Sequence, residues 1–339
     1  NYFFYKDINL IDSANYYWKK ALKKYVILND YNGIQDCFNS LALIAARNHN
    51  IFLADSLYNE ALKIGYKIQS NRYNATTYYN KSKLYSRNSI KENILKSNQY
   101  LGKSIKLSKK SNFDIQLMDS HFLLAQNYEN LYQYENAVEE FKKSNQIAKR
   151  FNYIDYQIKN SLYISNLKIK IGKLEEVPKY LNIINMLQNE FITHEFLFKF
   201  YEAKYNFSMK NYLDAIENLD SILNPKILSK YVANKYNLNK EGYQYLLEKY
   251  KKEINILRYL SLKNINKPNK NSISIDHFNE KMNFELNYFT YLLFDDNSYI
   301  KYAFIQIQEI ADAMDEDLKE KFLNYPIPKQ IIEEYNKVF

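Results

Sequence analysis

The stretch His121–Ala148, HFLLAQNYENLYQYENAVEEFKKSNQIA, contains the pattern that decides the fold. It reads as two short helices joined by a brief break. Ala125 and Tyr128 lie on one face of the first helix, and Ala137 and Phe141 lie on one face of the second. Small side chains let two helix backbones approach closely, and aromatic side chains fill the space around the contact. The stretch therefore predicts a helical hairpin.

The pattern of the second helix recurs along the chain. Its template is a small residue, a large residue four positions later, and a small or apolar residue seven positions later, so all three share one helix face. The six occurrences begin at Ala14, Ala54, Ser97, Ala137, Val177 and Ala215. The steps between them are 40, 43, 40, 40 and 38 residues. A steady period near 40 residues is typical of a helical repeat array.

The partner helices keep the same phase. A small residue lies twelve positions before the second-helix residue in four of the repeats, at Ala42, Ala125, Ser165 and Ala203. In the third repeat the separation is fifteen, from Ser82 to Ser97. We therefore expect a link that is three residues longer around Ser86–Lys91.

The hairpins resemble tetratricopeptide repeats (TPRs), which have the same small–aromatic–small arrangement. The usual TPR period is about 34 residues, and HEAT-type arrays, with periods near 40, are the structural alternative. The Ala/aromatic/Ala signature favours TPR. The resemblance implies an all-α fold, a right-handed superhelical array of antiparallel helix pairs (a solenoid) with a helical C-terminal cap.

The pattern divides the chain into three parts. Residues 1–262 are predicted to form the repeat array, 263–274 a polar loop, and 275–339 a degenerate repeat and the helical cap. Residues 231–262 read as a helix pair, and a break is expected at 325–328. The last part resembles the end of TPR regions in large bacterial signalling proteins. Because the chain opens on Asn1 rather than methionine, we expect it to be a piece of a longer protein.

Composition excludes several classes of protein. Five glycines and five prolines in 339 residues favour long helices with short links. The single cysteine, Cys37, excludes an internal disulfide framework and a zinc site made of paired cysteines. No apolar run approaches the roughly 18 residues of a membrane helix, so no membrane insertion is expected. We expect a cytoplasmic location, although a disulfide-free periplasmic protein would look the same.

Motifs for chemistry are incomplete. Gly102-Lys103-Ser104 matches the end of a phosphate-binding loop, but that loop needs a glycine five residues before Gly102. Ser97 occupies that position, within a predicted repeat helix. The four histidines lie far apart, and none has a second histidine at metal-ligand spacing. We therefore expect no enzymatic activity, no cofactor and no metal.

The resemblance implies a concave groove lined by the first helix of each repeat, which binds a peptide or partner protein. Residues at equal phase in successive first helices are the candidate groove residues, namely Asn39, Arg47, Tyr79, Lys83, Arg87, Phe122, Gln126, Asn130, Asn166, Lys170, Phe200 and Lys204. This basic, amide-bearing and aromatic set suits an acidic segment or a C-terminal carboxylate. The full Lys and Asn set of the TPR carboxylate clamp is not reproduced. Equally, these side chains could simply solvate a curved scaffold.

Charge suggests a second class of partner. Residues 263–339 hold nine lysines and thirteen Asp or Glu, which gives this part a net charge of −4. Because the whole chain has a net charge of +9, residues 1–262 carry +13. A basic face could follow phosphates while tyrosines stack on bases. A/T-rich codons would also supply both the lysines and the 35 tyrosines. The predicted function is therefore a non-catalytic interaction scaffold or sensor region, and a nucleic-acid-binding repeat protein is the alternative.

Overall fold

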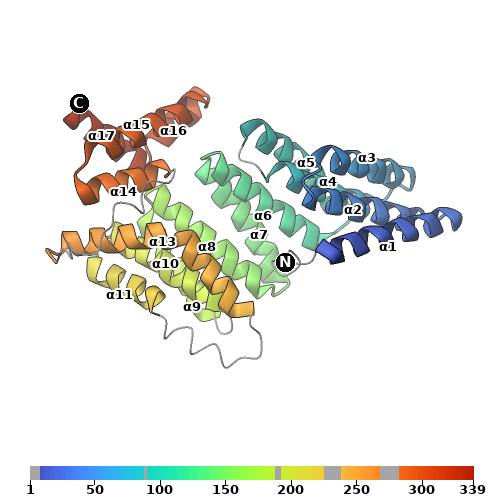
Figure 1. The fold of residues 1–339 in the computed structure, drawn as a ribbon, viewed down its shortest axis with the longest axis horizontal. Coiled ribbons are helices and arrows are strands. Elements are labelled where there is room, and N and C mark those ends of the chain that lie inside the picture. Colours follow the sequence, from blue (N-terminus) through green and yellow to red (C-terminus); the bar gives the residue numbers. More distant parts are fainter. Residues whose placement is uncertain (1–7, 88–89, 188–191, 225–237, 268–281) are drawn as a thin grey trace. The chain divides into compact units, whose positions relative to one another are not determined.

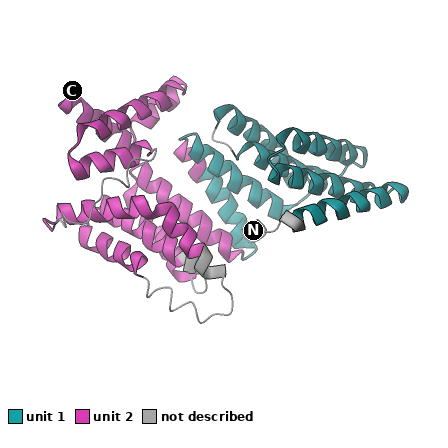
Figure 2. Cartoon of the chain, viewed as in Figure 1, with its two compact units in different colours: residues 1–132, 139–152 teal, residues 133–138, 153–339 magenta. Residues whose placement is uncertain are grey.

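The chain is folded into helices throughout the part that the computed structural model describes, residues 8–87, 90–187, 192–224, 238–267 and 282–339 (Figure 1). No strand occurs in these ranges. The chain forms two compact units (Figure 2). Unit 1 comprises residues 1–132 and 139–152, and unit 2 comprises residues 133–138 and 153–339.

The helices of the first part of the chain are α1 (Ile8–Ile27), α2 (Tyr31–Arg47), α3 (Ile51–Lys67), α4 (Asn71–Tyr85), α5 (Lys91–Lys110), α6 (Asp114–Asn130) and α7 (Tyr134–Arg150). Those that follow are α8 (Ile154–Lys170), the 3₁₀ turn η2 (Leu174–Glu176), α9 (Val177–Leu187), α10 (Ile192–Ser208), α11 (Tyr212–Leu223), α13 (Leu238–Asn264), α14 (Phe284–Phe294), α15 (Asn297–Asp312), α16 (Glu316–Leu323) and α17 (Pro326–Val338). Consecutive helices pack as pairs, α2 with α3, α4 with α5, α8 with α9 and α10 with α11. The predicted helix pairing is confirmed.

The repeating small–large–small residues form the core of these pairs. In α3, Ala54, Tyr58 and Ala61 are fully buried. Ala54 and Tyr58 belong to one apolar cluster with Ala42 of α2 and Leu84 of α4. The equivalent residues of α5, α7, α9 and α11 are also buried. The triplet of α1 is only half-buried.

Most links between helices share one geometry that explains the 40-residue period. Six helices have 17 residues each, and three residues separate α2 from α3 and α6 from α7. The middle residue of each such link adopts a left-handed conformation, as at His49 (φ 58°). The next residue donates its N–H to the carbonyl five positions back, as from Asn50 to Ala45 (3.0 Å), and Asn50 then caps α3. One helix and one link thus take 20 residues.

These left-handed positions yield a prediction for Gln69, whose φ is 55°. A residue with a Cβ atom is strained by roughly 1–2 kcal/mol in this conformation, and glycine is not. Glycine in turn loses more conformational entropy on folding, which costs roughly 0.5–1 kcal/mol. Gln69→Gly is therefore expected to raise the free energy of unfolding by about 0.5 kcal/mol in urea titrations. Gln69→Ala, which keeps the Cβ atom, should give no gain. Equal stability of the two variants would contradict the prediction.

Several predicted boundaries need correction. The region read as a helix pair over 231–262 is one continuous helix, α13, from residue 238 onwards, because no residue in it breaks the backbone hydrogen bonding. The break expected at 325–328 ends at Tyr325, because Pro326 is the first residue of α17. Proline is well suited to this position, since an N–H group in the first turn of a helix has no partner within the helix. The link of the third repeat is longer than the others by two residues rather than the expected three, because α4 ends at Tyr85 and α5 begins at Lys91, earlier in the repeat than the other second helices. Most of the predicted 263–274 loop lies outside the described residues, and α13 continues to Asn264.

The C-terminal helices contact the beginning of unit 2. Helices α14, α15, α16 and α17 pack together, and α14 also packs on α13. The Tyr325 ring lies 4.9 Å from the Tyr134 ring, and its hydroxyl donates a hydrogen bond to Glu135. In the link after α8, Gly172 has a φ of 78°, and a Cβ atom there would come within 2.9 Å of Pro326. Glycine thus permits both the turn and this close approach.

Candidate functional site

Three of the twelve candidate groove residues are buried, and a partner-facing role does not fit their position. Asn39 is 7% exposed, and its amide donates to Thr77 of α4 (2.9 Å). Asn166 is 6% exposed, and Phe200 is 1% exposed, with its ring 4.8 Å from the Tyr250 ring. Because successive first helices pack against each other, some equal-phase positions fall inside that contact rather than on the surface.

Four candidates from α2, α4 and the residues after α4 gather in unit 1. Arg47, Lys83 and Arg87 are exposed, and Tyr79 is half-buried. The Lys83 ammonium lies 5.4 Å from the centre of the Tyr79 ring. Arg87 donates from Nη1 to the carbonyl of Ala46 (2.7 Å), which holds its guanidinium at the negative end of α2. We call these four residues the cationic surface of unit 1.

The charges of this surface act on one another. Partial desolvation lowers the pKa of Lys83, and the neighbouring Arg87 and Arg47 lower it further, while Asp119 of α6 opposes them. Burial and the Asp119 carboxylate raise the pKa of Tyr79, so its hydroxyl stays neutral. Clustered cations that disfavour each other's charge would be stabilised by an anionic group placed among them.

The remaining unit 1 candidates lie along α6. Phe122 and Gln126 are half-buried, and Asn130 is exposed at the C-terminal end of the helix. The Phe122 ring meets the Phe141 ring edge-on, with 5.3 Å between centroids. Much of the Phe122 side chain therefore belongs to the packing of α6 on α7.

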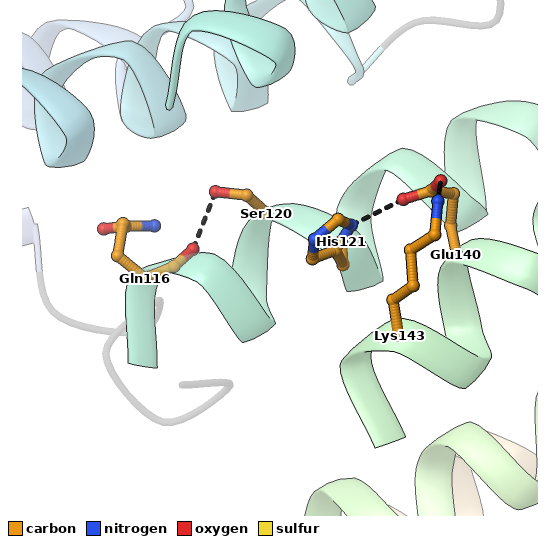
Figure 3. Close-up of polar contacts among 5 residues, drawn as sticks. All are labelled: Gln116, Ser120, His121, Glu140 and Lys143. Atoms are coloured by element: carbon orange, nitrogen blue, oxygen red, sulfur yellow. Dashed lines mark hydrogen bonds and ion pairs between the residues drawn. The ribbon is translucent and has the colours of Figure 1, made fainter. Parts of the chain in front are cut away.

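A hydrogen-bond network connects α6 to α7 beside these residues (Figure 3). His121 is 5% exposed, and its Nδ1 lies 2.5 Å from Oε2 of Glu140, whose other oxygen accepts from Lys143 (2.6 Å). Although burial opposes it, the hydrogen bonds from His121 and Lys143 lower the pKa of Glu140. Sequence periodicity does not reveal this pair, because the two residues lie nineteen positions apart on different helices.

Lys170 and Lys204 are brought together in unit 2. Both line a cavity of about 510 Å³ formed by the ends of α8, α10 and α13 with α14 and α17. The Lys204 side chain is 12% exposed and pairs with Glu253 of α13 (2.7 Å). Burial and the charge of Lys170 act to lower the pKa of Lys204. The carboxylates of Glu253 and Glu285 have the larger effect, so the pKa of Lys204 is raised. The Lys170 ammonium lies 5.2 Å from the Tyr134 ring centre.

The motif considered for phosphate binding lies within α5, where Gly102 is in mid-helix. Among the described residues, no three His, Cys, Asp or Glu side chains are grouped so that they could hold a metal ion. The described helices include none long and apolar enough to cross a membrane.

Comparison with known proteins gives structural matches only. No protein-family model matches the chain, and no curated protein sequence matches it. The structure resembles BtubC (BKLC) from P. vanneervenii, with a TM-score of 0.58 and 13% identity over 68% of this chain and 95% of that one. It also resembles apo RapI, with a TM-score of 0.52 and 17% identity over 89% of this chain and 99% of that one.

A putative kinesin light chain of Podosopora anserina with nearly identical TPR-like repeats matches with 15% identity over 58% of this chain and 96% of that one. Its TM-score of 0.47 is too low for the match to establish a shared fold. At 13% and 17% identity, the other two matches establish the fold alone. Together with the buried triplets and the paired helices, they show that the chain has the TPR-type, all-α helical-repeat fold.

Proposed function

We propose that this chain is a non-catalytic protein-recognition module, acting as a scaffold or as the sensor region of a larger signalling protein. Its partner supplies an acidic peptide segment, which binds at the cationic surface of unit 1. The observation that carries the proposal is the clustering of Arg47, Lys83 and Arg87, drawn from two successive repeats. Proteins of the TPR type commonly recognise peptides or partner proteins on the surface of the first helices.

The chemistry of this surface favours a carboxylate-bearing peptide. Guanidinium and ammonium groups form charge-assisted hydrogen bonds with carboxylates, and the Tyr79 ring offers an apolar face beside them. Convergent cations also raise the local potential and speed the approach of an acidic segment. The same cations would attract phosphates, so the nucleic-acid alternative has to be separated by experiment.

Lys83→Glu is expected to weaken binding of a fluorescein-labelled acidic peptide by about tenfold, measured by fluorescence anisotropy at low salt. Reversing the charge replaces an attraction with a repulsion at the centre of the cluster. The loss should shrink as salt rises, because exposed charges are screened over about 10 Å at 0.1 M. Lys83 is preferable to Arg87 for this test, since Arg87 also holds the end of α2.

Lys106→Glu makes the same charge change at an exposed position of α5 and serves as the control. The amidated form of the peptide tests whether a free C-terminal carboxylate matters. A single-stranded oligonucleotide of equal charge tests the alternative partner. Equal weakening by Lys83→Glu and Lys106→Glu would show that only net charge matters, and tighter Lys83-dependent binding of the oligonucleotide would favour nucleic acid.

A further inference from the structure

The cavity of unit 2 has the size of a small-molecule site. Its volume of about 510 Å³ lies within the range of ligand pockets in proteins. Helices α8, α10, α11, α13, α14 and α17 of unit 2 all contribute to its walls. The contacts of Tyr325 with Tyr134 and Glu135 hold the start of α17 in place. The cavity is therefore built mainly from packed helices.

The walls of the cavity are largely hydrocarbon. Leu257 and Leu260 of α13 line it and are almost fully buried, so they form a fixed part of the wall. Phe207 of α10 and Leu292 of α14 line it too, and both are half-buried. The Phe207 ring meets the Phe289 ring edge-on, with 5.7 Å between centroids. A ligand between these helices removes apolar surface from water on several sides, which is the main driving force for binding an apolar molecule.

Two lysines of the lining already have acidic partners. Lys204 pairs with Glu253 (2.7 Å). Lys263 pairs with Asp295 (2.8 Å) and also donates to the carbonyl oxygen of Leu292 (2.8 Å) at the C-terminal end of α14. Neither ammonium therefore requires a charged ligand in the cavity.

The charges of the other lining residues lead to the same result. The Lys170 ammonium lies 5.2 Å from the centre of the Tyr134 ring, a side chain outside the lining. Lys210 is exposed, so water solvates its ammonium. Glu285 lines the cavity as well and acts on the charge of Lys204. An ionic ligand would give up its own hydration here, while these groups already have partners or water.

We infer that this cavity binds a small, neutral and mainly apolar molecule between α10, α13 and α14. The apolar walls provide the binding free energy, and the cost of desolvation selects against ions. A peptide fits less well, because each peptide unit brings an N–H and a C=O that are costly to bury, and leucine side chains offer them no partner. The inference goes beyond the proposed function and does not depend on it, because its residues lie in unit 2.

Fluorescence titration of the whole chain with N-phenyl-1-naphthylamine, a neutral probe that brightens in apolar surroundings, tests the inference. We expect a saturable rise in fluorescence. Leu292→Asn replaces part of the hydrocarbon wall by an amide of similar size and should weaken probe binding by about tenfold or more. Leu293→Asn is the matched control, because it makes the same change at the neighbouring half-buried residue, which does not line the cavity. It should bind the probe like the native chain.

Displacement of the bound probe tests the charge of the ligand. Decanol should displace the probe at a lower concentration than decanoate, with decanoate kept below its micelle concentration, because the alcohol has no charge to desolvate. Stronger displacement by decanoate would contradict a neutral ligand.

Ser208→Trp keeps the inference testable if Leu292→Asn does not fold, which melting by circular dichroism would reveal. It places a large ring at an exposed position of the lining and should also weaken probe binding by about tenfold or more. Absence of saturable probe binding by the native chain, or equal loss in Leu292→Asn and Leu293→Asn, would overturn the inference. Either result would leave the acidic-peptide proposal untouched, since the cationic surface lies in unit 1.

Discussion

Replacing Ala54 with aspartate is expected to lower the melting temperature by about 8 °C or more. Ala54 is fully buried on α3, in the apolar cluster that also contains Ala42 and Tyr58. A carboxylate at this position would be forced among apolar side chains, and a buried charge in such surroundings belongs to the small class of substitutions that cost more than about 4 kcal/mol. For a unit of this size, each kcal/mol lowers the melting temperature by roughly 2–4 °C.

Circular dichroism at 222 nm follows the transition, with Ser56→Asp as the matched control. Ser56 lies on the same helix, two residues away, but is exposed. The control introduces the same acid without burying it, so its melting temperature should stay within about 2 °C of the native value. Similar melting of the two variants would mean that Ala54 does not lie at a close contact between helices.

The sequence predicts the helix pairs well because their packing depends on local periodicity. A triplet such as Ala54, Tyr58 and Ala61 occupies one helix face wherever the helix lies, and six triplets in phase leave little choice of fold. The structure buries Ala54, Tyr58 and Ala61 completely. The period near 40 residues likewise follows from 17-residue helices and three-residue links.

The conformation of the links could be predicted only in part. Gly172 in a left-handed link is a familiar signal, because glycine has no Cβ atom to clash. Gln69 and Tyr132 adopt the same conformation without that signal. Their backbone conformation is set by the short distance that a three-residue link must span between two packed helices. The type of residue in the link does not indicate that constraint.

Helical phase predicts the candidate site only in part, because it carries no information on burial or on contacts between distant segments. Arg47, Lys83 and Arg87, which helical phase places among the groove candidates, interact electrostatically in the structure. Phase alone does not show how deeply a neighbouring helix covers a position, so the sequence offers Phe200 as a groove residue although it is buried. The contact between Tyr325 and Glu135 joins residues 190 positions apart, and no periodic pattern extends over that distance.

The second large effect is expected at a buried ion pair in unit 1, where Asp55→Ala should cost about 3 kcal/mol of unfolding free energy. Asp55 of α3 pairs with Lys81 of α4 (3.1 Å) and accepts from the Tyr85 hydroxyl (2.6 Å). The Lys81 side chain is only 4% exposed. Without Asp55, the Lys81 ammonium would retain the Asn59 amide oxygen (2.5 Å) and the Tyr100 ring (5.0 Å to its centre), but it would lose the acid with which it pairs among the described residues.

The two partners should respond unequally. Desolvation lowers the pKa of Lys81 in spite of Asp55, so its surroundings disfavour the ammonium. Although burial opposes it, the hydrogen bonds from Tyr85 and Lys81 lower the pKa of Asp55, so its surroundings favour the carboxylate. Lys81→Met therefore removes a charge that the fold accommodates poorly and should cost less than about 1 kcal/mol, since Asp55 keeps Tyr85 and some contact with water.

A double-mutant cycle in urea measures this asymmetry, and Asp55→Ala/Lys81→Met should recover most of the stability lost in Asp55→Ala, because no ammonium is then left buried.

The pH dependence gives a second readout. A carboxyl group with a lowered folded-state pKa stabilises the fold above its unfolded pKa, and this stabilisation is lost as the pH falls through the folded value. The difference in stability between native protein and Asp55→Ala should therefore begin to shrink below about pH 4, and it should close only once the pH falls below the lowered folded-state pKa of Asp55. Equal costs for the two single variants, or no recovery in the double variant, would show that the pair itself contributes net stability.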